Sequence, residues 1–269
     1  MVRKLYKHEF LAWLRVMTLI YSITLLTAIF LRVIVAFETD SIYYQIISTS
    51  GILLWVVGML ATLAAPFIFG IVRFYKNLFS GQGYLTFTLP VRTTTHLWVK
   101  TLTTFSFCIA SFIVCFLSFC VVTSGDLLTE IWKAAVYLWK DIPQKYVGHV
   151  TRYILEGGLM VLAATFSSIM LYNFCLCVGQ LAKKNRILLS IGVYFGVYTV
   201  SQFLSTVAVI VVSAVDLAGN LQPLFDFIDK EPLKFIHIAL WIAIGIYLVI
   251  SAIFWLICRT ILRKKLNIE

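Results

Sequence analysis

Apolar residues along the chain fall into six long stretches that are separated by shorter polar segments. The stretches cover residues 16–37, 51–72, 101–125, 157–182, 187–215 and 235–258. A helix needs about 20 apolar residues to cross about 30 Å of hydrocarbon. Five stretches reach that length without Asp, Glu, Lys or Arg, and the first does so with only Arg32 near its end. The pattern predicts an all-α membrane protein with six transmembrane helices in a single transmembrane domain, residues 1–269.

Composition agrees with this pattern. Hydrophobic residues make up 61% of the 269 residues and charged residues 13%, and the mean hydropathy is +0.95. Soluble domains carry about 25% charged residues, so lipid must solvate much of this chain. The net charge of +10 would suit a nucleic-acid partner in a soluble protein, which makes the position of the charges important.

Lysine and arginine concentrate on one side of the predicted helices. Fifteen lie in the N-terminal segment, the second and fourth connections and the C-terminal tail, whereas six lie in the opposite connections. Cytoplasmic segments of membrane proteins carry this excess. The sequence therefore predicts that both termini are cytoplasmic in a plasma membrane. The basic excess is explained by topology and by anionic lipid, and no nucleic-acid partner is expected.

One outer connection has a helical pattern of its own. Apolar residues recur every three or four positions over residues 127–142, with Trp132 and Trp139 on one face, and Pro143 follows. This spacing predicts an amphipathic helix that lies at the outer membrane interface.

The sequence contains neither a nucleotide-binding motif nor a metal-binding motif of the common kinds. There is no Gly-Lys dipeptide and hence no phosphate-binding P-loop, and no H-E-x-x-H metal motif. The four histidines are scattered, and Cys175-x-Cys177 is more typical of packing than of a metal pair, because residues two apart on a helix face different directions. We expect no enzyme activity, metal or cofactor in this chain. Midspan polar groups are neutral, so ion-coupled transport is not indicated. The remaining alternatives are an uncoupled channel and a transporter that is driven by a partner protein.

The second connection, residues 73–100, is long and rich in aromatic residues. It reads RFYKNLFSGQGYLTFTLPVRTTTHLWVK. Phe74, Tyr75, Leu78 and Phe79 have helical spacing, and the Ser-Gly-Gln-Gly that follows interrupts it. Apolar side chains in a cytoplasmic connection need a partner surface, either another protein or the inner leaflet of the membrane.

This connection resembles the cytoplasmic loop of type-2 ABC-transporter permeases from Gram-positive bacteria, above all in the stretch GYLTFTLPV. The similarity extends to the six-span layout and to the basic start and tail. It implies a dimer of permeases, with a second copy or a paralogue, in which each subunit binds a cytoplasmic ATPase that carries ATP and Mg²⁺. Family loops often have an acidic pair before the Gly-Tyr, where this chain has Gly81 and Gln82.

The resemblance also implies roles for individual segments. A coupling helix within residues 74–89 would contact the ATPase, and Lys4–Trp13 with Glu9 would be an N-terminal interfacial helix. Residues 216–231 would form an outer cap, a role that their apolar pattern also favours. The implied ATPase contacts are Phe74, Tyr75, Leu78, Phe79, Gly83, Tyr84, Leu85, Phe87 and Leu89, and the implied cap residues are Leu221, Pro223, Phe225 and Phe227.

Gly192-x-x-x-Gly196 in the fifth span is a pair of small residues that lets helices approach closely. We expect it to pack against a neighbouring span of the same chain, with a dimer contact as the alternative. Together these features predict the permease subunit of an ATP-driven transporter that exports or extracts an amphipathic cargo such as a peptide, antibiotic or lipid. The alternatives are a membrane-embedded regulatory protein without transport, or an uncoupled channel or carrier.

Overall fold

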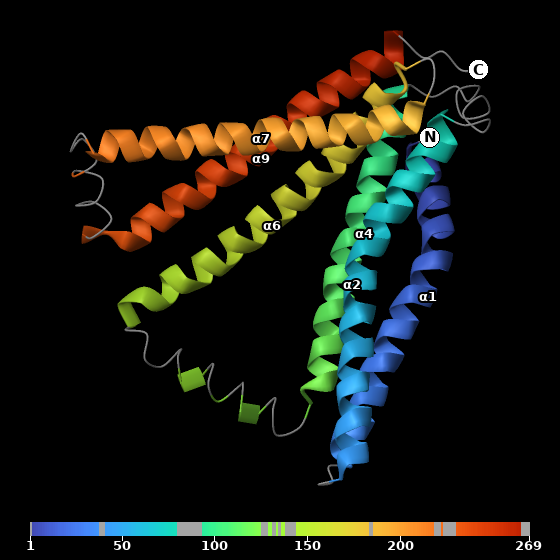
Figure 1. Ribbon diagram of the computed structural model, residues 1–269, viewed down its shortest axis with the longest axis vertical. Coiled ribbons are helices and arrows are strands. Elements are labelled where there is room, and N and C mark those ends of the chain that lie inside the picture. The colour runs from blue at the N-terminus through green and yellow to red at the C-terminus, as the bar shows by residue number, and fades with distance from the viewer. Residues whose placement is uncertain are drawn as a thin grey trace. The chain divides into compact units, whose positions relative to one another are not determined.

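The described part of the chain is all-helical and contains six long helices. The computed structural model describes residues 2–37, 41–79, 93–124, 129–130, 133, 136–137, 144–182, 185–217, 222 and 230–264. The helices are α1 (Val2–Ala36), α2 (Ile42–Phe79), α4 (Thr93–Val122), α6 (Gln144–Gly179), α7 (Arg186–Leu217) and α9 (Pro232–Lys264), as Figure 1 shows. Each contains most of one predicted apolar stretch, in agreement with the predicted number and order of helices.

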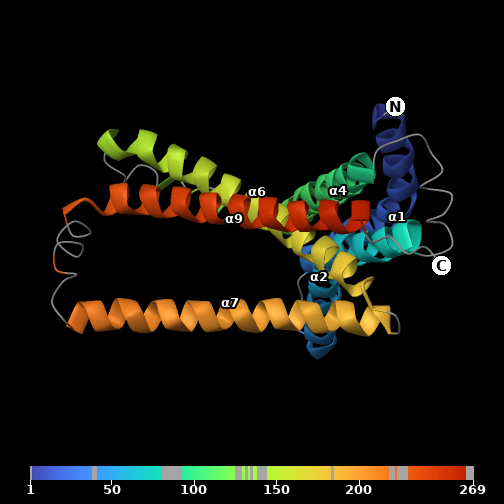
Figure 2. The same ribbon diagram turned by 90° about the horizontal axis from the view of Figure 1, so that it is seen from above.

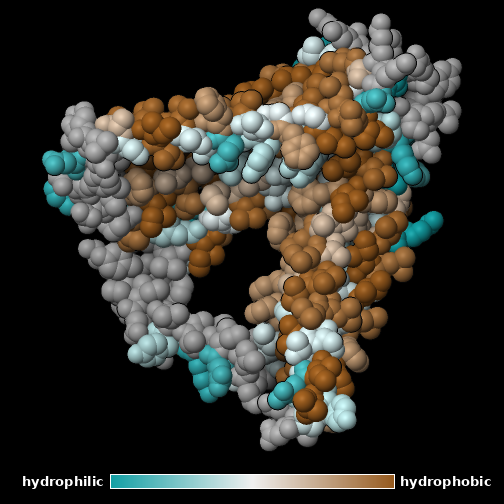
Figure 3. Space-filling view, viewed as in Figure 1, coloured by the Kyte–Doolittle hydropathy of each residue, from teal (hydrophilic) through white to brown (hydrophobic). Residues whose placement is uncertain are grey.

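All six helices are long and apolar enough to cross a membrane, which indicates a multi-pass membrane protein. At about 1.5 Å of rise per residue, the 38 residues of α2 extend about 57 Å, well beyond the hydrocarbon layer of about 30 Å. Hydrophobic side chains cover the flanks of the helices in Figure 3. Each helix is longer than the apolar stretch within it, because charged residues at helix ends mark where the apolar stretch stops and leave the backbone helical.

Two differences from the predicted elements follow from this extra length. The segment Lys4–Trp13 is helical as expected, but it continues without a break into the span, since α1 runs from Val2 to Ala36. The aromatic segment after Val72 likewise continues α2 to Phe79. Most of the predicted outer helix 127–142 and all four predicted cap residues lie outside the described residues, so these predictions stand as they were.

The contacts divide the chain into two compact units, Met1–Pro143 and Gln144–Glu269. In unit 1, α1 packs against both α2 and α4, and α2 packs against α4. Its core is a group of aromatic and apolar side chains around Trp13, Met17 and Phe107. The Trp13 ring stacks on Phe107 with centroids 5.2 Å apart and meets the edge of Phe69 at 4.9 Å.

Small and hydroxyl-bearing residues let the helices of unit 1 approach closely. The hydroxyls of Thr24 and Thr62 are 2.6 Å apart and join α1 to α2, and both residues are almost fully buried. The Trp55 indole donates to Ser118 Oγ at 2.7 Å and joins α2 to α4. A Cβ at Gly70 would lie 2.9 Å from a Thr104 methyl carbon, so this position needs glycine. Such contacts replace the hydrophobic driving force that lipid removes.

In unit 2, α6 packs along α9 and also contacts α7. Figure 2 shows α7 running apart from α9 over most of its length. The most apolar stretch of α6 is half buried, whereas none of the corresponding stretch of α7 is buried. A Cβ at Gly179 would clash with Ser190 Oγ and the Arg186 carbonyl, so glycine lets the chain turn closely from α6 into α7.

Candidate functional site

A cluster of polar and charged side chains lies at one end of unit 1, where α1 begins, α2 ends and α4 begins. Its centre is the carboxylate of Glu9 from α1. Arg73 Nε from α2 donates to Glu9 Oε2 at 2.6 Å, and Lys100 Nζ from α4 donates to Glu9 Oε1 at 3.0 Å. Asn77 Nδ2 donates a third hydrogen bond to the carboxylate, to Oε1 at 3.2 Å. One carboxylate thus joins all three helices, and we call these four residues the Glu9 cluster.

The Glu9 cluster is largely shielded from solvent. The side chains of Glu9 and Lys100 are 13% and 8% exposed, and that of Arg73 is 26% exposed. Phe69 lies beneath Arg73, with the guanidinium carbon 6.0 Å from the ring centroid. Ion pairs in such surroundings are strong but depend on every partner, because a buried charge without a counter-charge is costly. Losing Glu9 would leave two cations facing each other.

The Glu9 cluster lies at both ends of the connection between α2 and α4. Arg73 and Asn77 lie in the last two turns of α2, and Lys100 lies in the second turn of α4. Residues 80–92 connect these two helices. Glu9 therefore ties both ends of this connection to a single point on α1.

The structure places some of the implied ATPase-contact residues and leaves others undescribed. Phe74 and Tyr75 lie in the C-terminal part of α2, and the backbones of Leu78 and Phe79 form its last turn. Phe74 is 2% exposed, so its side chain belongs to the interior of unit 1 and is a poor surface anchor. Tyr75 is half-buried. Gly83, Tyr84, Leu85, Phe87 and Leu89 lie outside the described residues.

The sequence pattern did not reveal the Glu9 cluster as a unit. Arg73 and Lys100 counted only as topology signals, and Asn77 carried no signal of its own. The one available clue was Glu9, which is the only acidic residue among the first 37 positions. A lone carboxylate in a basic segment is a reasonable candidate for a buried ion pair. Its partners, 64 and 91 residues away, could be identified only from the packing.

A second polar group, also missed, lies in unit 2 where α6 and α9 pack together. Glu156 of α6 is 5% exposed. His237 Nδ1 of α9 lies 2.7 Å from Glu156 Oε1, and Trp241 Nε1 donates to the same oxygen at 3.4 Å. Glu156 and His237 each lie near the end of a predicted span, and the packing of α6 against α9 brings them together. The buried carboxylate is bonded here by an imidazole and an indole, in contrast to the arginine and lysine that bond Glu9.

The paired glycines of α7 are not packed against a neighbouring span of unit 2. Among the described residues, a Cβ at Gly192 or Gly196 would meet no atom within 4 Å, so the expected intrachain packing on them is wrong for the described part of unit 2. At 100° per residue, these glycines lie on the face of α7 opposite Tyr194 and Tyr198. That opposite face is the one turned toward α6, since Tyr194 stacks on Tyr172 with centroids 5.7 Å apart.

Comparisons with known proteins identify no relative: no family model, curated protein or solved structure matches the chain.

Proposed function

We propose that this chain is the membrane subunit of an ATP-driven transporter, and that a separate cytoplasmic ATPase binds residues 74–89. The resemblance of this segment to type-2 ABC permease loops motivates the proposal. The observation that best supports it is the Glu9 cluster, which ties the two helices flanking residues 80–92 to α1. A permease must convert movement of its ATPase into movement of its spans, and coupling requires a contiguous physical element that both sites bias.

The proposed energy path begins at the aromatic residues of the segment. Tyr84 and Phe87 are the anchors of the ATPase contact in this proposal, with Tyr75, Leu78 and Phe79 at its α2 side. ATP and Mg²⁺ belong to the partner. The displaced segment pulls on the ends of α2 and α4, and the Glu9 cluster makes α1 follow. The three helices then move as one body, which is how a small displacement at the cytoplasmic side is transmitted through the membrane.

The proposed assembly contains two permease subunits, a second copy or a paralogue, in a plasma membrane with both termini cytoplasmic. The exposure of α7 supports this arrangement. Its apolar side chains have little cover from unit 2, and Gly192 and Gly196 open away from α6. Paired small residues allow close approach of helices in lipid. The cargo in this proposal is amphipathic, because the middle of each predicted span contains no charged residue.

The decisive experiment is affinity purification of the tagged chain from its native membrane, followed by identification of any ATPase that comes with it. Truncating an aromatic anchor typically costs about 2 kcal/mol of binding, or roughly thirtyfold in affinity. Tyr84→Ala and Phe87→Ala should each weaken ATPase binding by that factor while the chain stays inserted. Tyr43→Ala, an exposed tyrosine of α2, is the matched control and should bind normally.

A second arm separates binding from coupling. Glu9→Asp keeps the charge but shortens the side chain by one methylene, so it should retain ATPase binding and reduce cargo-stimulated ATP turnover. Normal binding by both loop variants would refute the contact. It would favour the alternative that these aromatic residues lie on the inner leaflet in a regulatory protein without transport.

Topology is tested independently by cysteine labelling in a cysteine-free background. Cysteines at positions 41 and 220 should react from outside the cell, and a cysteine at position 80 should react only after the membrane is opened. Labelling of position 80 from outside would rule out a cytoplasmic ATPase contact.

A further inference from the structure

Unit 2 contains an open pocket of about 470 Å³ that is lined by α6, α7 and α9. Two of its wall residues, Tyr198 and Leu204, are 60% and 61% exposed, so the pocket is open to the surroundings of the protein. We call this open pocket the cavity of unit 2. Its walls come from residues 164–171, 194–204 and 247–254, which are near the middle of each helix. If the helices span the membrane as proposed, the cavity lies at the depth of the hydrocarbon. Its volume falls within the range of about 300–1,000 Å³ that is typical of small-molecule sites.

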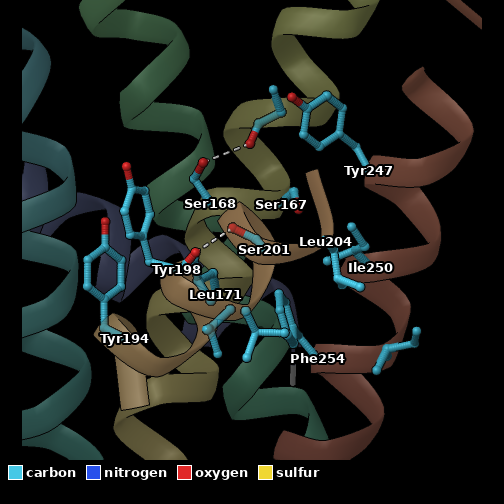
Figure 4. Close-up of a pocket in the computed structure, with 14 residues that line it drawn as sticks. Ser167, Ser168, Leu171, Tyr194, Tyr198, Ser201, Leu204, Tyr247, Ile250 and Phe254 are labelled. Carbon is cyan, nitrogen blue, oxygen red and sulfur yellow. Dashed lines mark hydrogen bonds between the residues drawn. The ribbon is translucent and has the colours of Figure 1, made fainter. Parts of the chain in front are cut away.

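The walls of the cavity combine hydroxyl groups with apolar side chains. Six hydroxyl-bearing side chains line the cavity: Ser167, Ser168, Tyr194, Tyr198, Ser201 and Tyr247. Figure 4 shows Tyr194 and Tyr198 side by side on α7, with Tyr247 reaching in from α9. Leu171, Leu204 and Phe254 contribute apolar surface. None of the lining residues is Asp, Glu, Lys, Arg or His.

Several of these hydroxyls have capacity for a further hydrogen bond. Ser168 donates to the Ala164 carbonyl at 3.0 Å, and Ser201 donates to the Tyr198 carbonyl at 2.9 Å. Their oxygens keep free lone pairs as acceptors. Within the described part of the chain, no hydrogen bond joins the hydroxyls of Tyr198 or Tyr247 to another protein group. Polar groups without partners are unfavourable in an apolar medium, so an occupant with hydrogen-bonding groups would stabilise this site.

Two simple occupants fit the walls poorly. A lipid acyl chain would fill the volume but would offer no hydrogen bond to the hydroxyls of Tyr198 and Tyr247. A charged solute would find no counter-charge, and an ion at this depth is strongly disfavoured. An aromatic ring can stack on the tyrosines while its polar substituent bonds to a hydroxyl.

From these features we infer that the cavity of unit 2 binds a neutral amphipathic molecule that combines an aromatic or aliphatic body with a hydrogen-bonding group. Tyr194 and Tyr198 contact the ring, and Tyr198, Tyr247 and Ser167 meet the polar group. Only the further step, that this molecule is the transported cargo, rests on the function proposed above.

The test uses photochemical crosslinking of the purified full chain in lipid nanodiscs without any ATPase. The probe is deuterium-labelled 4-hydroxybenzophenone, which is aromatic and uncharged in its phenol form, carries one hydroxyl, and differs in mass from the unlabelled compound. Mass spectrometry should locate saturable labelling on residues 164–171, 194–204 or 247–254. Excess unlabelled 4-hydroxybenzophenone should compete, and 4-benzoylbenzoate, which has the same ring system with a carboxylate, should compete about tenfold less well, because the walls supply no cation.

Variants distinguish a site from partitioning into lipid. Ser201→Leu fills the cavity and should reduce the saturable labelling about tenfold. Ser213→Leu is the matched control, since Ser213 is exposed on the same helix and bonds only to its own backbone. Tyr198→Phe removes one hydroxyl without changing the fold and should weaken 4-hydroxybenzophenone about fivefold, the effect of one neutral hydrogen bond.

Equal labelling of the Ser201→Leu and Ser213→Leu variants, or labelling spread evenly along the lipid-facing helices, would overturn the inference. Equal competition by the carboxylate would also overturn it. A positive result without ATPase copurification would keep the site and discard the transporter. ATPase coupling without saturable labelling would do the opposite.

Discussion

The two units of this protein each consist of three long apolar helices, but they differ in how closely those helices are joined. Unit 1 joins its helices by buried cross-helix bonds: the Glu9 cluster, Thr24 with Thr62, and Trp55 with Ser118. Unit 2 leaves α7 almost uncovered and keeps a cavity between its helices. The contrast suggests a division of labour, in which unit 1 transmits force from residues 80–92 and unit 2 accommodates a ligand.

The largest difference between the units should appear at their buried carboxylates. Among the described residues, Glu9 is the only counter-charge of Arg73 and Lys100. Glu9→Gln should therefore lower the free energy of unfolding by about 3 kcal/mol, near the lower end for buried pairs because Arg73 is partly exposed. Denaturation in mixed micelles measures this. Glu231→Gln is the control: its pair with Lys234 is exposed, and the change should stay below about 0.5 kcal/mol. Similar losses in both variants would show that the Glu9 cluster is not buried.

The second largest difference in stability is expected when leucine replaces a glycine in each unit. Gly70→Leu forces a side chain against Thr104 and Trp13 and should destabilise the fold by about 2 kcal/mol, as overpacking does. Gly196→Leu meets open space and should leave the free energy of unfolding within about 0.5 kcal/mol. In the proposed assembly it should instead weaken the dimer, which crosslinking in lipid can report. A misfolded Gly196→Leu variant would mean that another part of the chain covers this face.

The Glu156 group should have a smaller effect than the Glu9 cluster. Glu156→Gln keeps the size of the side chain and an acceptor for Trp241, and His237 is 38% exposed, so solvent can replace its partner. We expect a loss of about 1 kcal/mol, the contribution of one hydrogen bond. A double-mutant cycle with His237→Ala should show a coupling of about 0.5 kcal/mol or more. Strict additivity would mean that the two side chains do not interact.

The smallest expected difference concerns threonine hydroxyls. Thr24→Val removes the buried bond to Thr62 and should cost about 0.6 kcal/mol, the average for such bonds between membrane helices. Thr206→Val in α7 removes only an exposed bond to its own helix and should be neutral. If the two changes have equal effects, the hydroxyls of unit 1 contribute no more than those of unit 2.

Much of the fold was predictable because a membrane imposes it. Backbone groups in hydrocarbon must be bonded internally, so six apolar stretches of sufficient length become six helices. Helix ends were harder to predict. Charged residues such as Arg73 and Lys100 end an apolar stretch, but they leave a helix intact when it continues beyond the hydrocarbon.

The sequence by itself determined the class of protein, the number and order of its helices, and the charge asymmetry from which a topology is proposed. Only the tertiary structure decided which residues meet. Glu9 lies 64 residues from Arg73 and 91 from Lys100, and no local pattern encodes those distances. The same holds for the Glu156 group, the open face of Gly192 and Gly196, and the hydroxyls around the cavity. Helical periodicity says which residues share a face, whereas the neighbour of that face depends on how three similar apolar helices pack.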